Sequence, residues 1–423
     1  MAAVAMAHDG SPGPQRFSHA DALRVVAREY GFPSWPALKE HVAVLQSVDV
    51  FALDAVSTLD RRFRALFPDG GAHRPVIQVL TVEADAVLRA HEAGDGHGVM
   101  QIRDWTPVLI GKSPEELIKH PLSREQAFDG VAREHGYADW SQVPRKGGAL
   151  IDPVFERAVD AVVTGQLGVL DAMLADRPSL TTQRSAYGHQ AQLLHYCGAN
   201  GVETRRQMTP SNAPSVVRRL LEAGAEVDAL CNTYGGGPSQ TTLCLTISSG
   251  HPANAGVQVE MVEALLDGGA AVDGLGTLGE PLRLAVHCSR LDVAALLHRS
   301  GGTVTDLVTA VILDDHEGFL ERLSADPPGQ KEVAFLTACS LGRTPMLAPL
   351  ADEGVNPRNA VREGVGGMHL AAKGGHRTVV EWLIQAGVDP HEPDTRLGLR
   401  PSEWARRAGH VDLARLLEAG SVP

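Results

Sequence analysis

The feature that most constrains this chain is an aliphatic triplet at positions i, i+3 and i+4, followed three residues later by glycine. The pattern occurs four times, with its glycines at Gly224, Gly269, Gly387 and Gly420. Gly387 and Gly420 lie 33 residues apart, as do Gly354 and Gly387. Aliphatic residues at this spacing form one apolar stripe on a helix. A period near 33 therefore predicts a stack of small helical units, because a single unit cannot bury its own stripe.

A second pattern marks the start of the first helix in each unit. It reads HYCGANG at 195–201, CLTISSGH at 244–251 and HLAAKGGH at 369–376. The small pair Ala371-Ala372 lets this helix pack closely on its neighbour, and the following glycine ends it. The sequence predicts an all-α solenoid of about eight repeats that begins near Val154.

The segment GMHLAAKGGHRTVVEWLIQAGVDP at 367–390 closely resembles the ankyrin repeat, whose family pattern is TPLHLAAxxGHxxVVxLLLxxGAxxN. The segment at 400–420 follows it and reads as a C-terminal capping repeat. The resemblance is strong over 363–420 and interrupted over 188–304. Over 305–358 the helix-pair pattern remains, with little of the family sequence. The resemblance implies an ankyrin-like array whose usual role is to bind proteins.

Before the array, two segments align without gaps at an offset of 105. They read FSHADALRVVAREYGFPSW at 17–35 and LSREQAFDGVAREHGYADW at 122–140. In the second copy, Ser123 is placed as a helix N-cap with Gln126 three residues later, and Gly136 is placed to end the helix. Each copy predicts a helix–turn–helix unit closed by its tryptophan. The segment resembles a module often found ahead of ankyrin repeats in bacterial proteins, which implies no activity.

A charged pair late in each of these helices has two interpretations. Arg28-Glu29 and Arg133-Glu134 could form a ligand site, or they could be ordinary solvated or ion-paired surface. We favour the surface interpretation, because charged side chains near a helix end are common there.

The stretch PRKGG at 144–148 breaks the helical pattern and predicts a domain boundary. On this basis residues 1–148 form a duplicated helical module and residues 149–423 form the repeat array. Within the module, residues 84–94 and 114–120 predict further short helices.

Charge argues against nucleic acid as a partner. The formal net charge is −13. Residues 1–150 hold 16 basic and 19 acidic side chains, so −10 of that charge belongs to residues 151–423. An array with this balance repels phosphate backbones and favours a cationic or neutral partner.

The remaining composition predicts a soluble cytoplasmic protein. Five cysteines without CxxC spacing are typical of free thiols in a reducing compartment. The N-terminus lacks a basic stretch followed by an apolar run, so no signal peptide is expected. No segment approaches the ~20 apolar residues that cross a bilayer. Only 6 of the 38 basic residues are lysine, which favours a GC-rich bacterial source.

Irregular units are where function is most plausibly placed, because the array itself needs only the repeat pattern. Insertions at 202–213 (VETRRQMTPSNA) and 252–257 lengthen two inter-helix turns. The hairpin at 232–240 (NTYGGGPSQ) is long, and its glycines would allow a mobile lid or a close approach to a ligand. The GGG run lacks the spacing and lysine of a phosphate-binding loop.

Most histidines have a structural interpretation. His195 and His369 occupy the ankyrin position at which the ring hydrogen-bonds the neighbouring hairpin. His287 differs, since it replaces a variable inner-helix residue beside Cys288. The run DDHE at 314–317 reads as an acidic helix start rather than a metal site. We expect neither a metal nor a cofactor.

Our first hypothesis is a non-enzymatic ankyrin-repeat protein that presents a concave, acidic surface to a protein partner. Polar residues at inner-helix positions and hairpin tips would line that surface: Tyr187, His189, Asn200, Tyr234, Ser248, His287, Lys373, Asp394, Arg396 and Arg407.

The alternative is a cofactor-independent enzyme, such as a lyase, cyclase, isomerase or hydrolase, acting on a small molecule enclosed by repeats 2–4. It requires the insertions to close over a pocket lined by five groups: Tyr187, His189, Tyr234, His287 and Asp314. A shallow open face would contradict it. Fold alone does not decide between the two hypotheses.

Overall fold

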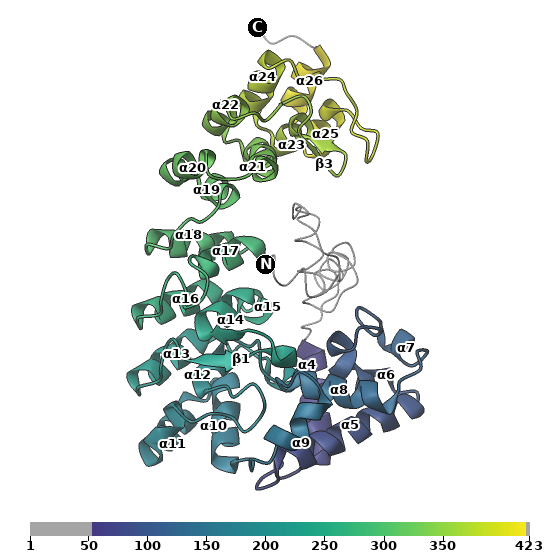
Figure 1. Ribbon diagram of the computed structural model, residues 1–423, viewed down its shortest axis with the longest axis vertical. Coiled ribbons are helices and arrows are strands. Elements are labelled where there is room, and N and C mark those ends of the chain that lie inside the picture. Colours follow the sequence, from purple (N-terminus) through teal and green to yellow (C-terminus); the bar gives the residue numbers. More distant parts are fainter. Residues whose placement is uncertain (1–52, 420–423) are drawn as a thin grey trace, which may run out of the picture. The chain divides into compact units, whose positions relative to one another are not determined.

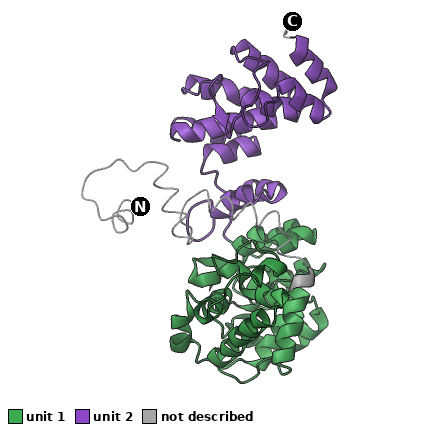
Figure 2. Ribbon diagram, turned by 90° about the vertical axis from the view of Figure 1, so that its right-hand side faces the viewer, with its two compact units in different colours: residues 1–270 green, residues 271–423 purple. Residues whose placement is uncertain are grey.

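The computed structural model describes residues 53–419, which divide into two units, one ending at Ala270 and the other starting at Ala271 (Figures 1 and 2). The first duplicated segment, 17–35, and Gly420 lie outside the described residues. The division into units does not test the boundary predicted at residue 148, which stays a prediction.

Unit 1 begins with a helical module built around a core that includes Leu80, Ile102 and Phe128. Its elements are the helices α4 Leu53–Leu66, α5 Val76–Glu92, α6 Gly96–Val99, α7 Pro114–Leu117, α8 Arg124–Glu134 and α9 Val143–Lys146, with the 3₁₀ helices η1 Met100–Trp105 and η2 Trp140–Gln142.

The second copy of the duplicated segment folds as predicted. The Ser123 side chain accepts a hydrogen bond from Gln126 N, and the Gln126 side chain accepts one from Ser123 N. Gly136 ends the helix with φ +83°. Trp140 packs edge-on against Phe128, with ring centroids 4.6 Å apart. The predicted helix at 84–94 proves longer, since α5 starts at Val76.

Residues 144–148, where the sequence predicts the boundary, form a helix end and a turn. Residues 143–146 form α9, and the backbone that follows pairs with the start of α5, where Ile77 N donates to Gly147 O at 2.9 Å and Val76 N to Ala149 O at 3.0 Å. This stretch is therefore tied to the helical module.

Three helix pairs complete unit 1: α10 Pro153–Val163 with α11 Leu167–Asp176, α12 Leu193–Cys197 with α13 Ala213–Glu222, and α14 Thr242–Ser248 with α16 Gln258–Asp267. Between them lie η3 Pro178–Thr181, η4 Thr204–Arg206, α15 Gly250–Asn254, and a hairpin formed by β1 Leu230–Asn232, η5 Tyr234–Gly236 and β2 Ser239–Thr241. The two strands are antiparallel, with Cys231 opposite Gln240.

Unit 2 contains five further pairs: α17 Glu280–His287 with α18 Leu291–Arg299, α19 Leu307–Leu313 with α20 His316–Leu323, α21 Pro328–Leu341 with α22 Leu347–Asp352, α23 Gly367–Gly374 with α24 Arg377–Gln385, and α25 Pro401–Arg407 with α26 Val411–Ala419. The helix η6 Thr344–Met346 precedes α22, and a short hairpin of β3 Val361–Arg362 and β4 Val365–Gly366 precedes α23. The first helices of successive pairs contact one another from α19 to α25. The described residues thus confirm the predicted all-α solenoid with eight pairs.

The aliphatic triplets supply the core of these pairs. Val217 and Leu220 are buried, as are Val380 and Leu383 in the regular repeat. After α24 the chain reverses at Gly387, whose φ of +81° is a conformation that side chains with a Cβ rarely adopt. In these pairs, therefore, the aliphatic triplet lies on the buried face of the second helix, and the following glycine lies in the turn that ends it.

Candidate functional site

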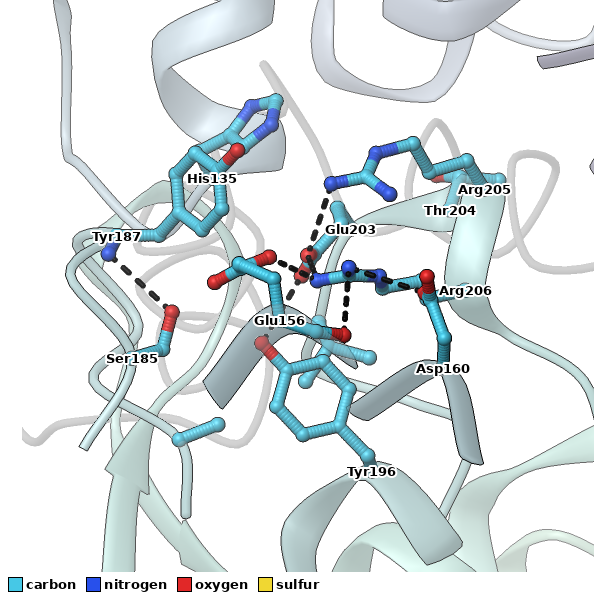
Figure 3. Close-up of polar contacts among 12 residues, drawn as sticks. His135, Glu156, Asp160, Ser185, Tyr187, Tyr196, Glu203, Thr204, Arg205 and Arg206 are labelled. Carbon is cyan, nitrogen blue, oxygen red and sulfur yellow. Dashed lines mark hydrogen bonds and ion pairs between the residues drawn. The ribbon is translucent and has the colours of Figure 1, made fainter. Parts of the chain in front are cut away.

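The insertion at 202–213 carries a run of charged residues into the interior of unit 1. Glu203, Arg205 and Arg206 lie at or beside η4, and all three are buried (Figure 3). Thr204 N donates to Glu134 Oε1 of α8 at 3.2 Å. The Arg205 guanidinium lies 3.7 Å from the centroid of the Phe63 ring of α4. The inserted residues therefore join the first repeats to the helical module.

Arg206 is surrounded by carboxylates. Its Nη1 lies 2.5 Å from Glu156 Oε2 and 3.1 Å from Glu203 Oε1, and its Nη2 lies 3.1 Å from Asp160 Oδ1 (Figure 3). A buried guanidinium is stable only when its donors meet acceptors in this way. The network thereby fixes the insertion against α10.

Glu203 also binds His189. His189 Nδ1 accepts a hydrogen bond from Ala191 N at 3.1 Å, so the proton of the neutral ring lies on Nε2, which donates to Glu203 Oε2 at 3.0 Å. Burial alone would raise the pKa of Glu203, yet the hydrogen bond from His189 and the charges of Arg206 and Arg205 hold it well below its usual value. Glu203 is thus an ionised, buried carboxylate whose charge is compensated by His189, Arg205 and Arg206.

A second buried acidic group lies in the helical module. His135 Nδ1 donates to Val131 O at 3.0 Å, which leaves Nε2 facing Glu83 Oε2 at 3.4 Å. In this tautomer Nε2 of the neutral ring carries no proton, and an ionised Glu83 carries none either. The contact is therefore favourable only when His135 or Glu83 is protonated. Burial lowers the pKa of His135, but the charges of Glu83 and Glu134 outweigh it and raise the pKa overall.

Glu134 is the least satisfied member of the group. One oxygen, Oε1, accepts from Thr204 N, while Oε2 has no hydrogen-bond partner. Burial raises the pKa of Glu134 to about 7; the charge of Glu83 adds to this effect and that of His135 opposes it. The expectation that Arg133 and Glu134 form solvated surface is therefore wrong for Glu134, because the insertion covers the end of α8.

These groups line a cavity of about 30 Å³. One wall is apolar, with Leu59, Phe63 and Val87 among its residues. The polar wall carries three carboxylates and four side chains with nitrogen donors: Glu83, Glu134, Glu203, His135, Arg205, Arg62 and Gln101. The volume is enough for one or two water-sized molecules.

A larger pocket of about 290 Å³ lies where the long hairpin meets the helical module. The module, the loop before α12 and the hairpin all contribute to its lining: Gly136, Tyr137, Gln142, Lys146, Ala186, Tyr187, Gly188, Gln190, Asn232 and Gly236. The hairpin is docked beside this pocket, because the Tyr234 ring stacks on Trp105 with centroids 4.1 Å apart. The backbone of Asn232 also donates to His189 O at 2.8 Å.

The predicted contact residues fall into three groups. Tyr187, His189 and Asp394 are buried. Asn200, Tyr234 and Ser248 are half-buried, and Asn200 Nδ2 donates to Ser248 Oγ at 2.9 Å. The exposed members all belong to unit 2: His287, Lys373, Arg396 and Arg407.

Asp394 has a local role. Its carboxylate accepts from the backbone of Arg396 at 2.9 Å and Leu399 at 3.1 Å, and from Trp404 Nε1 at 2.9 Å. These bonds hold the pKa of Asp394 below its usual value, although burial acts in the opposite direction. Asp394 therefore shapes the loop that presents Arg396.

Unit 1 brings together only part of the five-residue set required by the enzyme hypothesis. Tyr187 and His189 lie beside the buried carboxylates, with ring centroids 5.8 Å apart, and Tyr234 lies in the docked hairpin. His287 and Asp314 belong to unit 2 and are exposed. Neither of them lines either of the two pockets described above.

The structural interpretation of two sequence features is confirmed. His195 Nε2 donates to Ala229 O of the neighbouring loop at 2.9 Å. Asp315 caps α20, with its side chain accepting from Gly318 N at 3.0 Å. The run at 314–317 is therefore a helix start, as predicted.

Sequence reasoning missed the buried charges of unit 1. The missed residues are Glu83, His135, Glu134, Glu203, Arg205 and Arg206. Two signals were present in the sequence, namely the ARE of the duplicated helix and the ETRR of the insertion. Neither signal says which distant residues it pairs with.

The arrangement of helix pairs defines an α-helical repeat protein of the solenoid class. Within it, the ankyrin-repeat family model matches residues 368–395, which cover most of α23, all of α24 and the loop that follows. No helix in the described part of the chain is both long and apolar enough to cross a membrane.

Proposed function

We propose that the chain is a protein-binding repeat protein and that its contact surface lies on the regular repeats of unit 2. Ankyrin-type arrays usually bind proteins through hairpin tips and the exposed residues of their first helices. The match at 368–395 places this part of the chain among such repeats.

The observation that carries the proposal is a pair of touching loops with exposed apolar tips. Thr395 N donates to Gly364 O at 3.0 Å, so the loop before α25 contacts the hairpin before α23. Val361 is 52% exposed on one of them and Leu397 is 57% exposed on the other. Large apolar side chains on adjoining loops form a natural anchor for a partner.

Exposed cations lie on the same repeats. Arg396 is exposed beside Leu397, and Lys373 on α23 extends over the Trp404 ring of α25, with its Nζ 5.9 Å from the ring centroid. Arg407 is exposed at the end of α25. The net charge of −13 favours an acidic face, but at these repeats the exposed members of the predicted set are basic. The surface therefore suits a partner segment that combines acidic and apolar side chains.

Capture from a cell lysate, followed by mass spectrometry, tests this proposal. The double variant Val361→Asp/Leu397→Asp and the double variant Lys373→Glu/Arg396→Glu should each lose a protein that the wild type retains. The charge-reversal variant Lys373→Glu/Arg396→Glu tests whether the partner segment is acidic. The control is Leu320→Asp, because Leu320 is 51% exposed on the second helix of another pair. Equal loss in the control, or retention by both double variants, would contradict the proposal.

The enzyme hypothesis gains no support from the placement of its residues. Its five groups do not line one pocket, since His287 and Asp314 are exposed side chains of unit 2.

A further inference from the structure

The larger pocket of unit 1 has a polar lining without a carboxylate. Its volume of about 290 Å³ is near the lower limit of small-molecule binding sites. Lys146 is the charged residue of this lining, and its Nζ donates to Gln142 Oε1 at 3.2 Å. Within residues 53–419 the Lys146 ammonium group has no ion-pair partner. The pocket therefore offers one positive charge that no acidic side chain of its wall compensates.

Tyr137 brings a hydrogen-bond donor that the protein does not use. Tyr137 is only 1% exposed and lines the pocket, yet its hydroxyl has no hydrogen-bond partner among the described residues. Burial raises the pKa of Tyr137 to about 12, so the hydroxyl keeps its proton at neutral pH. A buried hydroxyl without an acceptor costs free energy, and an acceptor inside the pocket would remove this cost.

Backbone donors of the loop before α12 add to this surplus. Ala186 and Gly188 line the pocket, and their N–H groups have no acceptor in the described part of the chain. Gly188 lies against Tyr137, since a Cβ at this position would come within 2.8 Å of the Tyr137 ring. Gln190 of the same loop has a φ of +50°, which residues other than glycine adopt rarely. Backbone held in such a conformation is concentrated at ligand sites.

These groups select the chemistry of a ligand. The unpaired hydroxyl and N–H groups are donors and the one charge is positive, so a ligand must supply acceptors and a negative charge, as a carboxylate does. A single lysine balances one charge, which favours a carboxylate over a doubly charged phosphate. An amino group on the ligand would meet no anion in this lining. Hydroxyl groups suit it better, because the amides of Gln142 and Gln190 can donate to them.

We infer that this pocket binds a small carboxylate that carries hydroxyl groups, a molecule of the sugar-acid class. Lys146 pairs with the carboxylate, and the Tyr137 hydroxyl and the Gly188 N–H donate to its oxygens. The amides of Gln142 and Gln190 bind the hydroxyl groups. The site belongs to unit 1, so it is additional to the contact surface proposed on unit 2.

Isothermal titration calorimetry of the full chain at neutral pH and constant ionic strength tests the inference with two sugar acids, D-gluconate and D-glucuronate. At least one of them should bind in a saturable way at a single site. D-Glucose lacks the carboxylate and inorganic phosphate lacks the hydroxylated body, so each should bind at least about tenfold more weakly. Absence of binding by both sugar acids, or equal binding of glucose or phosphate, would overturn the inference.

Two variants test whether the sugar acid binds in this pocket. Tyr137→Phe removes only the unused hydroxyl, so it should retain the melting temperature of the wild type and raise the Kd about tenfold. Lys146→Met changes an exposed residue and should also raise the Kd about tenfold. The matched control is Lys119→Met, because Lys119 is an exposed lysine of the same module that does not line the pocket. A Kd that neither pocket variant raises, or that the control raises equally, would overturn the inference.

Discussion

Two buried glutamates of unit 1 have opposite pKa shifts because their partners differ. Glu203 is held ionised by a histidine donor and two guanidinium groups, while Glu134 has a pKa near 7 because burial penalises its charge. An acid whose folded pKa is raised contributes stability at low pH, and this contribution is lost as pH rises through the folded value. For Glu134 the loss falls between pH 4.5 and about 7.

The resulting pH dependence is a first prediction. At constant ionic strength, the free energy of unfolding of the wild type relative to Glu134→Gln should fall by about 2 kcal/mol from about pH 5.5 to about pH 8.5. Urea titrations at the two pH values measure this difference. Comparison with the variant cancels other groups, such as His195, whose pKa burial lowers to about 4. A difference that does not change with pH would show that Glu134 is solvated.

Arg206 gives a second prediction at this scale. Arg206→Met should lower the free energy of unfolding by about 3–5 kcal/mol, because Glu156 and Glu203 would be left as buried charges without their shared cation. Urea denaturation measures the loss. The matched control is Arg145→Met, at an exposed position of α9, which should change stability by less than about 0.5 kcal/mol. A similar small effect for Arg206→Met would rule out the network as a structural support.

At the scale of elements, the long hairpin is a docked structure. Its glycines suggest a mobile lid, yet Tyr234 stacks on Trp105 and its hydroxyl hydrogen-bonds the Gln207 side chain. Two of the three glycines serve the local turn, since Gly235 and Gly236 have φ values of +62° and +66°. A glycine run permits the same turn in a docked hairpin and in a mobile lid, so composition alone did not distinguish the two.

This contact leads to a third prediction. Tyr234→Ala should destabilise the chain by about 2 kcal/mol and increase amide hydrogen exchange across residues 232–241, because the stacking area is lost. Tyr234→Phe retains the ring and should stay within about 1 kcal/mol of the wild type. Urea denaturation and hydrogen-exchange mass spectrometry measure the two effects. Unchanged exchange in Tyr234→Ala would mean that the hairpin is held by its backbone alone.

At the scale of the whole chain, local patterns predicted the repeats well. The triplets and glycines depend on residues within one helix and its turn, so the pairs that carry them could be read directly from the sequence, and the others followed from the period. The same is true of His195 and the cap at Asp315. The pairing of the insertion with the module could not be read in this way. Thr204 meets Glu134 across 70 residues, and nothing local to ETRR or AREHG identifies the other partner.

The predicted contact residues include buried ones, because long-range packing could not be read from local sequence. Register predicted Lys373, Arg396 and Arg407 as contact residues, and all three are exposed in the regular repeats. It could not show that Tyr187 and His189 are covered, because the cover comes from a helical module and an insertion outside the repeat pattern. The irregular repeats thus hold buried charges, and the regular ones hold the exposed surface.

The most direct test of the proposed function is hydrogen exchange of the full chain with and without the partner captured by the wild type. We expect protection in peptides spanning residues 361–375 and 394–407, where the touching loops and the exposed cations lie. The outer helices α24 and α26 should exchange as they do in the free chain. Protection confined to those outer helices, or to residues 202–240 of unit 1, would contradict the assignment of the binding surface.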